Sequence, residues 1–152
     1  MRRWGASARA LRGVVALAPL LALALTLPAG TPPVWVWVGA TACSVWWAVR
    51  PEGPGGVLSL VGVAGWWAWV EPGLPVTVVP AAALLLAAHV SALVLGYGPP
   101  ELRPGRAVLA LWGRRAALLA AAAVPVWWVG TLVLDAGAAP GWVWPLAGAL
   151  VA

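Results

Sequence analysis

The chain has 152 residues, of which 63% are apolar and only 9% are charged, and its formal net charge is +5. Soluble domains are about 45–50% apolar and about 25% charged, so this composition excludes a soluble globular protein. It also excludes a disordered chain, which would be poor in apolar residues. The composition therefore predicts an integral membrane protein.

Apolar runs separated by Pro, Gly and charged residues predict an all-α polytopic bundle of five or six transmembrane helices. In chain order the runs are residues 13–27, 34–49, 57–70, 76–97, 116–134 and a short last run, 142–151. Crossing the hydrocarbon core takes about 20 residues, so the second and third runs need flanking residues or a thinner bilayer. The last run is either a sixth helix or a re-entrant or outer-surface segment. All runs belong to one membrane domain, residues 1–152.

The arginines predict the orientation of this bundle. All nine basic residues are Arg, and they lie before the first run, after the second, and between the fourth and fifth. The connections 28–33, 71–75 and 135–141 contain none. If the runs alternate in direction, every Arg falls on one side, which is cytoplasmic by the positive-inside rule. We therefore expect three hairpins with a cytoplasmic N-terminus, and a first run that is retained as a helix and not removed as a signal peptide.

The residue types that are absent from the sequence indicate the kind of organism that encodes the protein. The sequence has no Phe, Ile, Lys or Asn, whose codons are AT-rich, and it has 13 Trp. This bias predicts a bacterium with a GC-rich genome, and the protein is expected in its cytoplasmic (inner) membrane. Tryptophan favours the membrane–water boundary, so we interpret most of the Trp residues as interfacial.

Two segments resemble each other within the chain. Residues 27–37 read LPAGTPPVWVW and residues 134–144 read LDAGAAPGWVW. The match has two interpretations: a parallel repeat of the first and last hairpins about the membrane normal, or chance similarity in a biased composition.

The sequence offers little catalytic chemistry. The four acidic residues all lie in connections, and no glycine-rich phosphate loop, HExxH or GxSxG pattern occurs. A single Cys and a single His cannot complete a metal site. Because the Arg residues flank apolar runs and do not form a soluble basic face, nucleic acid is not an expected partner. We expect no enzyme activity, no cofactor and no metal.

His89 is the one ionisable side chain well inside an apolar run, which makes it a functional candidate. Thr41, Cys43 and Ser44 lie at a similar depth in the second run, so these four residues form a candidate intramembrane polar cluster. Small residues border His89 at four-residue spacing, and this pattern favours close helix packing. We expect His89 to hydrogen bond across the helices; proton or ligand handling is the alternative.

Residues 98–115 form the largest predicted connection, on the cytoplasmic side. We expect it to lie in the membrane interface, although it could also dock a cytoplasmic partner. Its predicted interfacial anchors are Arg103, Arg106, Trp112, Arg114 and Arg115. Two prolines, Pro80 and Pro125, are predicted inside the fourth and fifth helices.

These features favour a non-catalytic accessory or structural subunit of a larger membrane assembly. Its expected partners are the lipid bilayer and either another membrane protein or a second copy of the chain. The alternative is a small transporter or channel-like protein with His89 as its intramembrane polar element.

Overall fold

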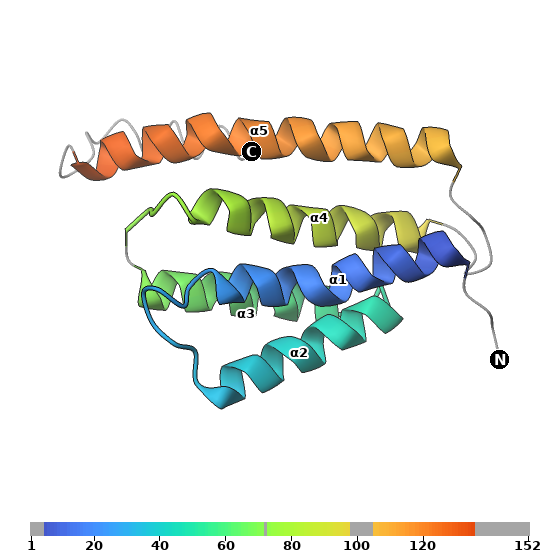
Figure 1. The fold of residues 1–152 in the computed structure, drawn as a ribbon, viewed down its shortest axis with the longest axis horizontal. Coiled ribbons are helices and arrows are strands. Elements are labelled where there is room, and N and C mark those ends of the chain that lie inside the picture. The colour runs from blue at the N-terminus through green and yellow to red at the C-terminus, as the bar shows by residue number, and fades with distance from the viewer. Residues whose placement is uncertain (1–4, 72, 98–104, 136–152) are drawn as a thin grey trace.

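A computed structural model of the chain describes residues 5–71, 73–97 and 105–135. This part of the chain contains five helices and no strand, which confirms the all-α prediction there (Figure 1). The helices are α1 (Ala6–Ala24), α2 (Val34–Val49), α3 (Gly55–Val70), α4 (Val78–Gly96) and α5 (Arg106–Asp135). The predicted short helix 142–151 and the second copy of the repeat, apart from residues 134 and 135, lie outside the described residues.

Three of these helices are long and apolar enough to cross a membrane. They contain the segments Ser7–Ala24, Val78–Gly96 and Ala107–Leu134. The other two, α2 and α3, are apolar but have only 16 residues each. The second and third runs were expected to be short. The first run, 13–27, is as short as they are, and α1 reaches a spanning length because it begins at Ala6.

Helix α1 lies several residues earlier in the chain than its apolar run, 13–27. It begins at Ala6 because the residues before Gly13 are mainly Ala, Arg and Leu, which favour a helix although they include charges. It ends at Ala24, where a hydrogen-bonded turn follows. There the Thr26 hydroxyl donates to the Leu23 carbonyl oxygen over 2.8 Å, and the Ala29 N–H donates to the Thr26 carbonyl oxygen over 3.0 Å.

Helix α5 corrects the prediction of a helix over 116–134 preceded by a loop over 98–115. Residues 106–135 form one helix of 30 residues, about 45 Å long at 1.5 Å per residue. The charged pair Arg114–Arg115 was taken as the boundary, but charge does not interrupt a helix. Between Arg106 and Arg115 the sequence has good helix formers and no Pro, so the helix continues through them.

The two internal prolines also differ in their effect. Pro125 lies inside α5, as predicted. Helix α4 begins at Val78, so Pro80 lies in its first turn, where the missing N–H has no helical acceptor to lose. Pro80 thus lies within the fourth helix, as predicted, but at its N-terminal end and not in its interior. Pro19, inside α1, is the second interior proline.

Consecutive helices run in opposite directions, so the bundle has two distinct ends (Figure 1). We call the end with the start of α1, the α2–α3 turn, the end of α4 and the start of α5 the basic end. Helix α1 is central and packs against α2, α3 and α4, whereas α5 packs mainly along α4. At the opposite end, Trp127 on α5 donates its indole N–H to the Leu74 carbonyl oxygen over 2.8 Å.

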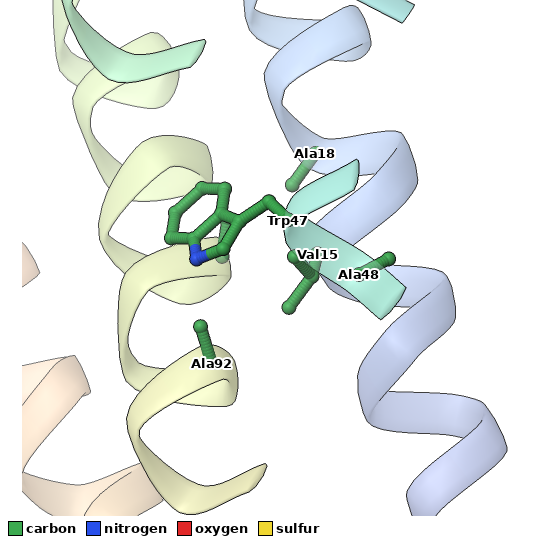
Figure 2. Packing of buried hydrophobic residues seen from close by; sticks show 6 residues of the cluster. Val15, Ala18, Trp47, Ala48 and Ala92 are labelled. Atoms are coloured by element: carbon green, nitrogen blue, oxygen red, sulfur yellow. The ribbon is translucent and has the colours of Figure 1, made fainter. Parts of the chain in front are cut away.

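Two clusters of buried residues form the core. Near the basic end, Val15 and Ala18 of α1 and Ala88 and Ala92 of α4 surround Trp47 of α2, which is only 2% exposed. Figure 2 shows the Trp47 ring reaching from α2 toward α4, past the small side chains of α1. The second cluster joins Ala22, Val63, Trp67 and Ala81. Small residues thus let three helices close around two large indole rings.

Candidate functional site

The polar cluster predicted around His89 is divided in the structure. Ser44 is fully buried, and its hydroxyl lies 3.1 Å from that of Ser59, which is 2% exposed. Ser59 belongs to α3 and was missed by the sequence reasoning. The signal was present, because Ser44 and Ser59 are placed symmetrically about the α2–α3 turn at residues 51–52. A tight helical hairpin brings such positions opposite each other.

The other three members of the predicted cluster are not hydrogen bonded to this serine pair in the described part of the chain, although Cys43 lines the same groove as Ser59. Thr41 is exposed and Cys43 is partly buried. His89 is exposed, and its ring lies 6.5 Å from the Trp47 ring, centroid to centroid, at an interplanar angle of 45°. Among the described residues His89 therefore contacts an indole, and no hydrogen bond joins it to Thr41, Cys43 or Ser44.

His89 lies instead on the wall of a cavity between α3 and α4 at the basic end, which we call the α3–α4 cavity. Its volume is about 340 Å³. Its lining is mostly apolar but includes one carboxylate, one imidazole, one phenol and one indole. The lining residues are Trp47, Pro51, Glu52, Gly53, Gly56, Val57, Leu60, His89, Ala92, Leu93, Gly96 and Tyr97.

Glu52, the carboxylate in this lining, is exposed and lies in the connection between α2 and α3, as the sequence predicted. The α2–α3 turn carries it toward the end of α4. A Cβ atom on Gly96 would lie 3.7 Å from the Glu52 Cγ atom and 3.8 Å from Oε1. The absence of a side chain at Gly96 thus gives the Glu52 side chain room beside α4.

A second hollow, the α2–α3 groove, is larger and almost entirely apolar. Its volume is about 620 Å³. Helices α2 and α3 are close at their turn and diverge away from it (Figure 1). The groove residues are Leu23, Trp35, Val36, Gly39, Ala40, Cys43, Leu58, Ser59, Gly62, Val63, Gly65, Trp66 and Trp69.

Glycines allow α2 and α3 to approach each other closely at the turn. Beyond the turn, other glycines border open space between the two helices. A Cβ on Gly55 would lie 2.9 Å from the Trp47 backbone nitrogen, and a Cβ on Gly56 would lie 2.7 Å from the Trp47 ring. Only glycine permits this approach. In contrast, a Cβ on Gly39, Gly62 or Gly65 would meet nothing within 4 Å. These positions face open space in the groove.

The basic end also holds the predicted anchors that the structure describes. Trp112 on α5 stacks with Tyr97, at 6.2 Å between ring centroids and 26° between planes, and the Arg115 guanidinium carbon lies 5.5 Å from the Trp112 ring centroid. Arg114 is exposed. Arg106 begins α5, and Arg103 lies outside the described residues. Trp112 therefore joins α5 to the end of α4.

Arg12 was not among the predicted anchors, but it connects two helices. Its Nη1 donates to the Ala48 carbonyl oxygen and, over 3.2 Å, to the Val49 carbonyl oxygen. These are carbonyls of the last turn of α2, which have no N–H partner within the helix. A cation at this position also interacts favourably with the negative end of the helix dipole.

Metal-ligating groups are not gathered in the described part of the chain, where no three His, Cys, Asp or Glu side chains could hold an ion together. No protein-family model matches this chain, and no curated protein and no solved structure is significantly similar to it.

Proposed function

We propose that the protein spans the cytoplasmic membrane of a bacterium with a GC-rich genome, with all five described helices crossing it. The alternating helix directions support this arrangement, since they bring the Arg residues of α1, the α2–α3 turn and the start of α5 to one end. By the positive-inside rule that end, with the N-terminus, faces the cytoplasm.

We further propose that the protein is a non-catalytic accessory subunit whose α2–α3 groove receives a transmembrane helix of a partner protein. The α2–α3 groove is the observation that carries this proposal. Its walls are made of small residues such as Gly39, Ala40 and Gly62, which allow a third helix backbone to come close. Helices in lipid associate through such close packing, because lipid tails are as apolar as the helices.

Exposure of the groove walls supports the same proposal. Trp35 and Trp69 are 72% and 83% exposed, so large aromatic surface beside the groove is free to contact a further helix. A helix lying in the groove would cover these rings and recover the dispersion contacts that an open groove lacks. Helix α5 has no fully buried residue in its apolar segment, so it also offers exposed area.

The experiment is photo-crosslinking in intact membranes from position 35, with a crosslinking amino acid at Leu118 on α5 as the site control. We expect position 35 to give an adduct with another membrane protein. Gly39→Leu should abolish the adduct by filling the groove, whereas Gly113→Leu, which also meets nothing within 4 Å, should leave it unchanged. Adducts containing two copies of this chain would indicate self-association. Adducts with lipid alone, or equal adducts from both positions, would contradict the proposal.

A small transporter or channel-like protein is the second candidate, because His89 and Glu52 line one cavity. Proton flux into vesicles containing the purified protein tests it. If transport is the function, His89→Gln and Glu52→Gln should both abolish the flux while the protein remains folded. An accessory subunit should show no flux in any variant.

A further inference from the structure

We propose that the α3–α4 cavity binds a small organic ammonium ion, with Glu52 as the counter-charge and Trp47 as the aromatic wall. This site is separate from the α2–α3 groove and does not depend on the accessory role. Its volume of about 340 Å³ lies within the range of small-molecule sites, which are mostly apolar with a few polar groups.

The charge of the cavity lining favours a cationic ligand over an anionic or neutral one. The protein as a whole is basic, with a net charge of +5, but the cavity lining contains a carboxylate and no arginine. Two helices, α2 and α4, end at this cavity, and one, α3, begins there. Arg12 already donates to the last carbonyl oxygens of α2. The C-terminus of α4 carries partial negative charge, which adds to the field of Glu52.

The aromatic and aliphatic lining residues favour an organic cation with an apolar carbon chain over a metal ion. An ammonium group is attracted to the face of an aromatic ring, and Tyr97, which is exposed, offers such a face on the cavity lining beside the buried Trp47. Trp47 is held in place by the core around it, so its ring is a fixed wall. Leu60, Leu93 and Ala92 offer apolar surface to a short carbon chain. A transition metal would need more ligands than Glu52 and His89 supply.

The ammonium group has two possible sources. In the proposed orientation the cavity lies at the cytoplasmic boundary of the membrane, where a phosphatidylethanolamine headgroup would present a primary ammonium. A free amine from the cytoplasm has the same chemistry. The headgroup source rests on the proposed membrane orientation, whereas the binding itself rests on the cavity alone.

The test is isothermal titration calorimetry of ethanolamine into the full-length protein, held in nanodiscs of phosphatidylglycerol. Ethylene glycol, which has nearly the same shape without the charge, is the matched ligand control. Glu52→Gln removes the charge and keeps the shape, and Glu71→Gln removes an acid that lies at the other end of the bundle. Gly96→Leu fills the space beside Glu52 and keeps the carboxylate. Gel filtration establishes that each variant remains folded.

We expect saturable binding of ethanolamine and none of ethylene glycol. Glu52→Gln should weaken binding at least about tenfold, the loss expected when a charge partner is removed. Gly96→Leu should abolish it, and Glu71→Gln should leave it unchanged. If phosphatidylethanolamine discs remove the binding of free ethanolamine, the headgroup is the ligand; if binding persists, a free amine is. Absence of ethanolamine binding to the wild-type protein in phosphatidylglycerol discs, equal binding of ethylene glycol, or equal affinity of Glu52→Gln would overturn the proposal.

Discussion

Gly56 shows how one residue sets the distance between two helices. A Cβ at this position would lie 2.7 Å from the Trp47 ring, and the ring cannot move aside because α1 and α4 enclose it. The absence of a side chain at Gly56 therefore allows the α2–α3 turn to be tight.

Gly56→Ala should lower the free energy of unfolding by about 1–3 kcal/mol, the usual cost of overpacking. Gly62→Ala is the matched control, since a Cβ there meets nothing within 4 Å. It should be neutral or stabilising by up to about 1 kcal/mol, because alanine favours a helix. Unfolding by sodium dodecyl sulfate, followed by circular dichroism, measures both. Equal stability of the two variants would show that the Trp47 ring moves to accommodate the added methyl group.

The serine pair and His89 show which polar contacts the fold satisfies. Ser44 and Ser59 are both buried and hydrogen bonded to each other, so neither remains unsatisfied in the core. His89, in contrast, is exposed on the wall of a cavity. The prediction of a shared polar cluster grouped residues by depth along the chain. The structure separates them by the direction in which each side chain leaves its helix.

At the scale of elements, Arg12 connects α1 to the end of α2. Its guanidinium donates to two carbonyl oxygens of the last turn of α2, and hydrogen bonds made by charged groups contribute about 1.5–3 kcal/mol each. Arg12 makes this contact from within α1, because the helix begins at Ala6, before its apolar run. A helix beginning at Gly13 would not include Arg12.

Arg12→Leu should therefore lower the free energy of unfolding by about 1–3 kcal/mol, because the last carbonyls of α2 lose their donor. Arg9→Leu is the control, since Arg9 is exposed and lies one turn earlier on the same helix. It should change stability by less than about 0.5 kcal/mol. The same detergent titration distinguishes them, and equal losses would indicate a general effect of removing positive charge from α1.

For the whole molecule, the alternation of helix directions makes the proposed membrane orientation testable. In a Cys43→Ser background, a single cysteine at Gly73 should react with an impermeant maleimide added outside intact cells. A cysteine at Glu101 should react only after the cells are opened. The expected difference follows from the Arg residues at one end of the bundle. Labelling of position 101 from outside intact cells would contradict the proposed orientation.

The sequence by itself determined the class of secondary structure and the approximate positions of the helices. Apolar runs bounded by Pro, Gly and charge predict helices from local information, and α2 and α3 begin and end within two residues of their runs. Boundaries at charged residues were predicted less well, as α1 and α5 show, because Arg is compatible with a helix. The three helices long and apolar enough to cross a membrane follow from composition and length.

Only the tertiary structure decided which side chains meet. Helices α3 and α4 are apolar on nearly all sides, so their sequences contain no polar stripe that would identify the buried face. Rotation of each helix about its axis was therefore undetermined. That rotation turns His89 toward Trp47, and the packing of the α2–α3 turn against α4 places Glu52 beside Gly96. The groove opens because Gly55 and Gly56 bring α3 against Trp47 at the turn, whereas beyond the turn a Cβ on Gly39 or Gly62 would meet nothing within 4 Å, and such a fit between facing helices exists only once they have packed.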